Sequence, residues 1–343
     1  MFIPLHAPRE HVLRPNSSQI AERDWQILAD FWYPIAEVSE IRDLPFKATL
    51  LDVDLALFRD ADGKIAVVLD MCPHRLIRLS GGTVEDGQIV CPFHGLHFDG
   101  SGKCTLVPAL GDKGRLPASY RVRNFPVKEL YGLVWTCLGD ATKHDLPSFP
   151  TLLDAPRDEL VHISSAIWPI SAPRQIENFF DLAHLPFVHA TTLGGDPKAE
   201  LKPGHVEQTD DAVIMTAQYY ETAGKTNHLC NYRYRVVLPF ALEFGMQAVD
   251  DPNFSLTSCD IPSPVSAYTS RVFQILRTQL PESEWPSLRT AFEKINGEDI
   301  GVLSQMRVLN MPLDQHHEIH LPVDNISNAY RSRLRELGLG QGE

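Results

Sequence analysis

A segment at residues 177–189, E-N-F-F-D-L-A-H-L-P-F-V-H, combines carboxylate, amide and imidazole side chains with apolar ones. Residues three or four apart share one face of a helix, so a helix here would place Asn178, Asp181 and His184 in one polar line, with Glu177 beside it. Polar groups among apolar neighbours need hydrogen bonds, charge partners or a metal, because burying a neutral group unpaired costs roughly 2–7 kcal/mol. A bound metal would satisfy these groups.

His184 and His189 are five residues apart, so on an ideal helix they would point about 140° away from each other. Pro186 lies between them, lacks an amide donor and clashes with the preceding turn. We therefore predict a break at Pro186 that turns both imidazoles toward one ion. Two histidines and one carboxylate, with the remaining positions open, form the ligand set of non-haem Fe(II) oxygenases.

The carboxylate can come from far along the sequence, and residues 283–310 read as a long helix that contains Glu298-Asp299-Ile300. We favour Asp299 as the third ligand, with Glu298 as the alternative. An acidic residue in a helix is usually a surface charge, and a pair of histidines alone is rarely a metal site. The prediction therefore depends on a second motif.

The second motif is Cys72-Pro73-His74 followed, after sixteen residues, by Cys91-Pro92-Phe93-His94. Two cysteines and two histidines can hold a structural zinc, but zinc sites usually pair two cysteines in one knuckle. Here each loop is mixed, which suits a [2Fe-2S] cluster of the Rieske type, with two thiolates on one iron and two imidazoles on the other. Such clusters have potentials of roughly −150 to +300 mV, so this one would accept electrons from a reductase. The flanking Gly81, Gly82 and Gly95 would let the backbone approach the sulfides.

Composition sets bounds on function. The 343 residues suffice for two domains, and 43% hydrophobic and 22% charged residues are ordinary for a soluble globular protein. A net charge of −13 argues against nucleic-acid and anionic-membrane surfaces. No apolar run approaches the roughly 20 residues that span a bilayer, and the N-terminus does not resemble a signal peptide. The six dispersed cysteines fit a reducing compartment, so we predict a cytoplasmic protein.

Two domains follow a lead-in segment at residues 1–30. Residues 31–145 contain strand-like runs separated by Asp62-Gly63, Asp86-Gly87 and Asp99-Gly100 turns, which predict an all-β domain. A proline-rich connector begins at residue 146, and residues 146–343 form the second domain. It contains strand-like runs at residues 206–222, 228–238, 241–249, 255–260 and 267–280, the helix at 283–310 and a terminal helix at 326–337.

The expected fold class is therefore α+β, with an antiparallel sheet and long helices in the second domain. Such a sheet with a helix across it can enclose an apolar cavity. Candidate cavity walls are Tyr232, Tyr234, Phe240, Phe244, Met246 and Phe273, and Asn231 and His228 are candidate contacts to a polar substituent.

The combined motifs resemble those of the terminal oxygenase component of the Rieske non-haem iron oxygenases. The resemblance covers C-x-H, sixteen residues, C-x-x-H and, about 85 residues later, N-x-x-D-x-x-H-x-x-x-x-H. The chain looks most like the shorter homo-oligomeric branch, which includes vanillate and dicamba O-demethylases and methylxanthine N-demethylases. That resemblance implies a helix-grip-like catalytic domain after the Rieske domain.

Carried over residue by residue, the resemblance implies Cys72, His74, Cys91 and His94 as cluster ligands and His184, His189 and Asp299 as ligands of the mononuclear iron. It implies that Asp181 bridges a cluster histidine of one subunit and His184 of its neighbour in a homotrimer, and that Asn178 lies near the iron. Leu96 departs from the family, where tryptophan is frequent, so the local packing should differ; His97 should be a surface or supporting residue.

The implied activity is hydroxylation of a small aromatic substrate with O₂. Electrons would come from NAD(P)H through a reductase, with or without a ferredoxin. Hydroxylation of an O- or N-methyl carbon would release formaldehyde, and we predict this oxidative demethylation. Ring mono- or dioxygenation is the alternative enzyme activity. A Rieske electron carrier without oxygenase activity is the alternative from another class, although it would need only the first half of this chain.

Overall fold

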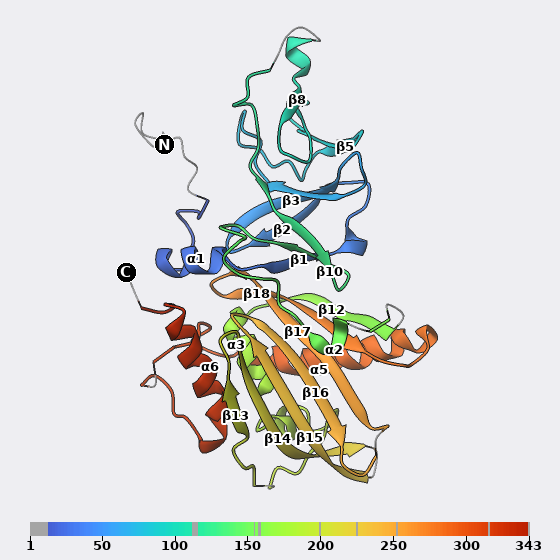
Figure 1. The fold of residues 1–343 in the computed structure, drawn as a ribbon, viewed down its shortest axis with the longest axis vertical. Coiled ribbons are helices and arrows are strands. Elements are labelled where there is room, and N and C mark those ends of the chain that lie inside the picture. The colour runs from blue at the N-terminus through green and yellow to red at the C-terminus, as the bar shows by residue number, and fades with distance from the viewer. Residues whose placement is uncertain are drawn as a thin grey trace.

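The structure is a computed structural model that describes residues 13–111, 116–153, 155–156, 159–198, 200–223, 226–251, 253–314 and 316–341. Figure 1 shows two parts along the long axis, with a β-rich N-terminal part above a large sheet and its helices. The beginning of the predicted lead-in, residues 1–12, lies outside the described residues. The remainder of the lead-in includes α1 (Glu22–Ala29), whose buried Trp25 and Leu28 join the core.

Small antiparallel sheets build the N-terminal part. One contains β1 (Tyr33–Glu37), β11 (Leu133–Thr136) and β10 (Val127–Leu130), and the next contains β2 (Phe46–Leu50), β3 (Val53–Arg59), β4 (Ile65–Leu69) and β9 (Asn124–Phe125). The third, farthest from the C-terminal part in Figure 1, contains β5 (Thr83–Glu85), β6 (Gln88–Val90), β7 (His97–Phe98) and β8 (Cys104–Leu106). The β5–β6 hairpin turns at Asp86-Gly87, both with positive φ, as its two-residue loop requires.

A seven-stranded antiparallel sheet dominates the described C-terminal part, in the order β12-β18-β17-β16-β15-β14-β13. Its strands are β12 (Leu160–Trp168), β13 (His205–Gln208), β14 (Ala212–Ala223), β15 (Thr226–Val237), β16 (Ala241–Ala248), β17 (Ser255–Ser266) and β18 (Thr269–Arg277). Consecutive strands from β13 to β18 are neighbours, so hairpins build most of the sheet. β12 precedes this series in the sequence and pairs with β18, so it forms the edge of the sheet opposite β13.

Helices cover one face of this sheet. They are α3 (Ala172–Phe180), α4 (Leu185–Val188), α5 (Trp285–Leu303) and α6 (Asn325–Glu336), and α2 (Pro150–Leu153) lies in the connector. The helix predicted at 283–310 ends seven residues early, at Leu303, and the described residues between 304 and 321 form no helix or strand. The terminal helix lies one residue from its predicted bounds.

Both faces of the sheet are packed. The face toward α3 and α6 contributes Tyr232, Tyr234 and Phe244 to the main core, whereas Phe273 and Cys259 face the N-terminal part and pack near Trp135. The predicted α+β class, with an all-β domain and a sheet-and-helix domain, is confirmed. The domain boundary predicted at residue 146 stays a prediction.

Candidate metal centres

The segment that carries the first motif is not one helix. α3 ends at Phe180, and Asp181 has extended backbone angles (φ −76°, ψ 119°). The prediction that Asn178, Asp181 and His184 share one helical face is therefore wrong. The break also precedes its predicted position, because Pro186 stands in the first turn of α4, where its missing amide hydrogen leaves no helical bond unmade.

This early break brings the predicted ligands together. Asp299 Oδ1 lies 3.1 Å from His189 Nε2 and 3.6 Å from His184 Nε2. The three ligand atoms lie within 4.8 Å of one another, and they form the one such group of histidine, cysteine or acidic side chains within the described residues. His189 is 1% exposed and Asp299 7% exposed, so the group is nearly closed to solvent.

A second carboxylate stands behind each imidazole. Glu298 Oε2 lies 2.8 Å from His189 Nδ1 and accepts a hydrogen bond from Thr192 Oγ1 at 2.6 Å. Asp181 Oδ2 lies 3.4 Å from His184 Nδ1, while its other oxygen accepts the Ala183 amide at 2.7 Å. When a carboxylate accepts the Nδ1 proton, Nε2 is left free to bind a metal. Glu298, predicted as the alternative ligand, contacts His189 at Nδ1, and Thr192, for which the sequence gives no signal, donates to Glu298.

The metal-free pKa values show how strongly these groups compete for protons. Burial opposes ionisation of Asp299, but the two facing imidazoles outweigh burial and lower the pKa of Asp299 to about 2. Burial also disfavours charge on His184, yet the facing carboxylates of Asp181 and Asp299 raise the pKa of His184 to about 9. A divalent cation would replace the protons on the imidazoles.

The donor set fits a mononuclear iron. Asp299 Oδ1 is buried and has no hydrogen-bond partner of satisfactory geometry, although two imidazole nitrogens face it. Buried polar atoms normally have partners, so this convergence is better explained by a shared metal than by hydrogen bonding alone. Two imidazoles and one carboxylate are the ligands that non-haem Fe(II) sites use.

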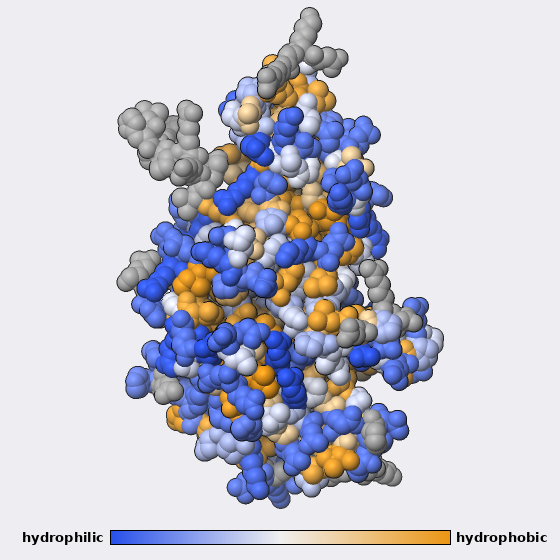
Figure 2. All heavy atoms as spheres, in the orientation of Figure 1, coloured by the Kyte–Doolittle hydropathy of each residue, from blue (hydrophilic) through white to orange (hydrophobic). Residues whose placement is uncertain are grey.

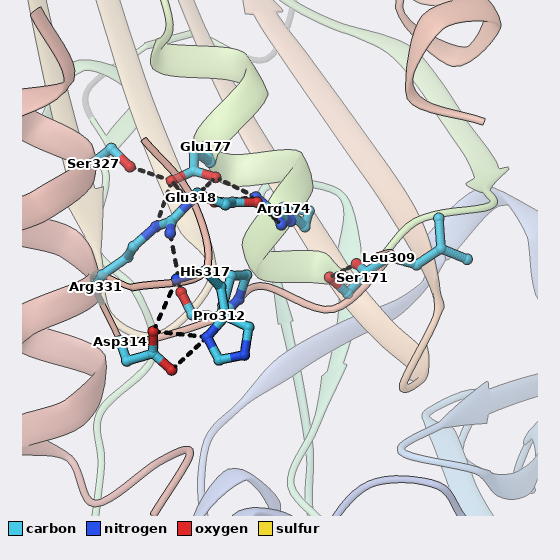
Figure 3. A network of polar contacts seen from close by, with 10 residues as sticks. All are labelled: Ser171, Arg174, Glu177, Leu309, Pro312, Asp314, His317, Glu318, Ser327 and Arg331. Carbon is cyan, nitrogen blue, oxygen red and sulfur yellow. Dashed lines mark hydrogen bonds and ion pairs between the residues drawn. The ribbon is translucent and has the colours of Figure 1, made fainter. Parts of the chain in front are cut away.

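Glu177 does not join this group. It accepts hydrogen bonds from Arg174, Arg331 and Ser327, while Glu318 pairs with both arginines (Figure 3). These contacts link α3 to α6 and to the segment before α6. Ionic partners therefore satisfy the Glu177 carboxylate, which anchors the helix that leads into the ligand segment.

The two loops of the second motif have the same backbone hydrogen bonds. In the first, the Cys72 amide donates to Ile77 and the Cys72 carbonyl accepts from Leu76; in the second, Cys91 pairs in the same way with Leu96 and Gly95. Leu76 and Gly95 each have positive φ, 60° and 66°. Each loop therefore forms the same tight turn after its cysteine.

The predicted cluster ligands meet at the ends of these loops. Cys72 and Cys91 are buried free thiols, and burial together with the neighbouring Cys91 raises the pKa of Cys72 to about 11. The rings of His74 and His94 are exposed, with centroids 4.6 Å apart. Two inner thiols and two outer imidazoles fit a [2Fe-2S] cluster of the Rieske type.

Neighbouring residues support these loops. Leu96, where the family often has tryptophan, packs in the same apolar cluster as both cysteines. His97 lies in β7 and is partly buried. Gly82 was expected to let the backbone approach the sulfides, but a Cβ there would lie 1.9 Å from the Val90 carbonyl oxygen, so its explanation is strand packing.

A cavity of 260 Å³ lies next to Asp181 and is bordered by Asn178, Asp181, Leu182, Met215 and Leu303 among others, but none of the three predicted iron ligands borders it. The predicted walls Tyr232, Tyr234, Phe240, Phe244 and Met246 are buried in the core and do not border this cavity, but Tyr232 and Met246 border a second cavity of 980 Å³. Phe273 faces away from α3.

The two candidate polar contacts are occupied elsewhere. Asn231 is exposed and accepts a hydrogen bond from Gln218 at 2.9 Å. His228 pairs with Asp250 at 3.1 Å. Neither residue borders the cavity next to Asn178, but Asn231 borders the second cavity with Tyr232 and Met246.

Two family models match the chain. The Rieske [2Fe-2S] domain matches residues 31–126, which contain both Cys/His loops. The vanillate O-demethylase oxygenase C-terminal domain matches residues 170–339, which contain His184, His189 and Asp299. The chain belongs to the Rieske oxygenases. This Rieske oxygenase is an oxidoreductase with a [2Fe-2S] cluster and a mononuclear non-haem iron, supplied with NAD(P)H electrons by a reductase.

Individual relatives agree with this assignment. Methylxanthine N1-demethylase NdmA of Pseudomonas putida is 29% identical over 329 residues, which cover 92% of this chain and 90% of the relative. The oxygenase component of dicamba O-demethylase from Stenotrophomonas maltophilia is 38% identical over 172 residues, 48% of each chain. The structure of NdmA with caffeine superposes with a TM-score of 0.79 at 26% identity, covering 91% of this chain and 92% of that one.

The helices give no sign of a membrane span. Among the described residues of this Rieske oxygenase, none of the helices combines the length and apolar composition that crossing a bilayer requires.

Proposed function

We propose that this chain is the terminal oxygenase component of a multicomponent demethylase that removes a methyl group from the oxygen or nitrogen of a small aromatic substrate. The convergence of His184, His189 and Asp299 carries the proposal, because it occurs in a domain matched by the vanillate O-demethylase family. NdmA and the dicamba enzyme are named as N- and O-demethylases, so both bond types are candidates.

His184, His189 and Asp299 would hold the iron, and Cys72, His74, Cys91 and His94 would hold the cluster. Three protein ligands leave open positions at which Fe(II), when bound, supplies O₂ activation. The reaction would convert one methyl group, O₂, two electrons and two protons into formaldehyde, water and the demethylated phenol or amine. The cluster histidines are exposed at the tip of the N-terminal part, where a reductase or ferredoxin can reach them.

The residues around the triad would hold the ligands in one orientation. Glu298 would keep the proton of His189 on Nδ1, and Asp181 would do the same for His184, so that both Nε2 atoms face Asp299. Nearly complete burial of His189 and Asp299 would limit the access of bulk water to the reactive position.

Asp181 would have a second role in a homotrimer. Its side chain is 41% exposed, so the carboxylate can accept a hydrogen bond from outside while contacting His184. A cluster histidine of a neighbouring subunit could be that donor. In Figure 1 the third sheet of the N-terminal part lies at the far end of the long axis from α3, which favours contact between subunits over contact within one chain.

Apolar surfaces support a head-to-tail arrangement. At the cluster tip, Leu76 is 50% and Phe93 56% exposed beside the two histidines. At the iron site, Phe187 of α4 is 68% exposed. Figure 2 shows hydrophobic residues at the upper end of a largely hydrophilic face. Because the two surfaces differ and lie on different parts of one chain, repeated pairing would be head-to-tail, and a rotation of about 120° between neighbours would close it into a trimer.

The substrate would occupy the 260 Å³ cavity beside Asn178. Leu182, Met215 and Leu303 offer apolar contacts for an aromatic ring, and Asn178 offers an amide to a polar substituent. Arg174, Lys202 and Arg331 also border the cavity, so a small aromatic substrate with a methoxy or N-methyl group would meet charged as well as apolar contacts.

Ring hydroxylation or dioxygenation is the second enzyme activity that this ligand set allows. It would use the same metals and give no formaldehyde. A pure electron carrier would leave the triad and the oxygenase domain without a role. For compartment, the buried free cysteines favour the reducing cytoplasm that the sequence predicts.

The direct test is formaldehyde release by reduced, iron-loaded protein given O₂ and methoxylated, N-methylated or unsubstituted aromatics. Formaldehyde from a methylated compound, with none from the His184→Ala variant, supports demethylation. Hydroxylated or diol products without formaldehyde from any methylated compound would replace it with ring oxygenation.

A further inference from the structure

A second acidic residue lies in the interior of the oxygenase domain, and the proposed reaction does not use it. Asp260, in β17, is completely buried. Its side-chain contacts are with the amide side chains of Gln175 and Gln274, and it has no salt bridge within the described residues. An ionised carboxylate in such a place lacks the charge partner that burial normally requires.

Asp260 belongs to a chain of buried polar side chains. Gln175 Nε2 on α3 donates to Asp260 Oδ2 at 2.7 Å. Gln274 lies directly opposite Asp260 on β18 and interacts with the same carboxyl group. Gln274 Oε1 in turn accepts from Asn296 Nδ2 on α5 at 2.6 Å. The chain therefore runs from α3 through the sheet to α5.

Two oxygen atoms in this polar network have no hydrogen-bond partner among the described residues. Asp260 Oδ1 and Gln175 Oε1 are both buried without a hydrogen bond, and both can only accept when Asp260 is ionised. A proton on Oδ1 would give the carboxyl group a donor and Gln175 Oε1 an available partner. Protonation would turn one of these two unsatisfied acceptors into a donor.

The outermost residues of this polar network, Asn296 and Gln175, are near the proposed iron ligands in sequence. Asn296 is three residues before Asp299, one turn away on α5, so both lie on the same side of the helix. Gln175 is on α3, which leads directly into the segment with Asp181 and His184. The polar network thus lies between α5, which carries Asp299, and α3, which precedes His184 and His189.

We propose that Asp260 is a positioning residue that stays protonated in the folded protein and, through Gln175, Gln274 and Asn296, fixes the spacing between α3 and α5 and so the iron-ligand geometry. This inference rests on the proposed iron site. Burial raises the pKa of Asp260 to about 7, against the hydrogen bonds from both glutamines, and the negative charge of Asp299 adds to the increase. A neutral acid also avoids placing a second unpaired negative charge near Asp299.

Two substitutions test whether the hydrogen bonds of a protonated Asp260 matter. Asp260→Asn keeps one acceptor and supplies an N–H donor, so it reproduces the hydrogen bonds of the protonated acid. Asp260→Leu keeps a similar volume and removes the hydrogen bonds. Ser263→Ala is the control, because Ser263 is a buried polar residue on the same strand whose hydroxyl has no partner within the described residues.

The full-length protein is tested for Fe(II) affinity and for the infrared carbonyl band of a protonated carboxylic acid. Cluster absorbance and circular dichroism verify that each variant folds. We expect the acid band at pH 6 in wild type and Ser263→Ala but not in Asp260→Asn. We expect unchanged Fe(II) affinity in Asp260→Asn and Ser263→Ala, and a loss of about tenfold or more in Asp260→Leu.

The outcomes are decisive in either direction. Absence of the Asp260 band, unchanged iron affinity in a folded Asp260→Leu variant, or equal loss in Asp260→Asn would each overturn the proposal. A wild-type protein that shows the band but takes up no Fe(II) would overturn the positioning role and the iron site together, whereas a wild type that binds Fe(II) but lacks the band would leave the proposed function intact.

Discussion

Glu298 and Asp299 are adjacent carboxylates on α5, and the structure gives them different partners. Asp299 Oδ1 faces both Nε2 atoms, at 3.1 and 3.6 Å, whereas Glu298 lies behind His189 at its Nδ1. Asp299 is therefore expected to bind the iron directly, and Glu298 is expected to orient His189. Replacing each carboxylate separately distinguishes these roles.

Loss of a carboxylate behind a metal-bound histidine typically weakens metal affinity 10–100-fold, or about 1.4–2.7 kcal/mol. Glu298→Gln keeps the shape but removes the charge that accepts the Nδ1 proton at 2.8 Å, so we expect a loss in this range. Asp299→Ala removes one of three protein ligands and should reduce iron occupancy to near zero at concentrations that saturate the wild type. The assay is anaerobic Fe(II) titration against a competing chelator, with cluster absorbance as the measure of protein.

A matched control lies on the same helix. Glu293 is exposed, and Glu293→Gln makes the same chemical change one turn from Glu298 without touching a histidine. It should bind iron as the wild type does. Loss of all iron in Glu298→Gln together with full occupancy in Asp299→Ala would reverse the ligand assignment.

Other substitutions test the remaining parts. Cys72→Ser should abolish the visible absorbance of the cluster and leave Fe(II) binding at the other site; an unchanged spectrum would refute the cluster ligands. Asp181→Asn should retain both metals but lower turnover about 10–100-fold, because the carboxylate that contacts His184 is lost, and wild-type turnover would exclude that role. Asp260 keeps its proton up to about pH 7 when folded but releases it near pH 4 when unfolded, so protonation stabilises the fold most at low pH. The unfolding free energy of wild type relative to Asp260→Asn should therefore fall by about 1.4 kcal/mol per pH unit between pH 4 and 7, measured by urea titration; a flat difference would contradict the raised pKa.

Much of the fold follows from local signals in the sequence. The Asp86-Gly87 turn predicts its hairpin because both residues must adopt positive φ. The strand-like runs predicted in the second domain all correspond to strands of the seven-stranded sheet. The pairing of β12 with β18 could not be predicted, because it joins segments about a hundred residues apart and no local pattern specifies the partner.

The metal ligands were more predictable than their surroundings. Residue types and spacing identified His184 and His189, but the helix end at Phe180 depends on tertiary packing, so the sequence suggested a continuous helix and a break at the wrong place. Adjacent residues on a helix point about 100° apart, and only the fold shows that Asp299 faces the imidazoles. The network around Asp260 gave no sequence signal because a single acidic residue in a strand normally faces solvent.

The most direct test of the two sites acting as one oxygenase is complementation between inactive subunits. Cys72→Ser lacks the proposed cluster and His184→Ala lacks the proposed iron, so neither variant alone should release formaldehyde from a methylated substrate. When the two variants are co-expressed in equal amounts and assemble at random into head-to-tail rings, about a quarter of neighbouring pairs place the intact cluster of His184→Ala next to the intact iron site of Cys72→Ser. The mixed oligomers should therefore have about a quarter of wild-type activity. Mixed oligomers as inactive as either parent would contradict transfer between subunits.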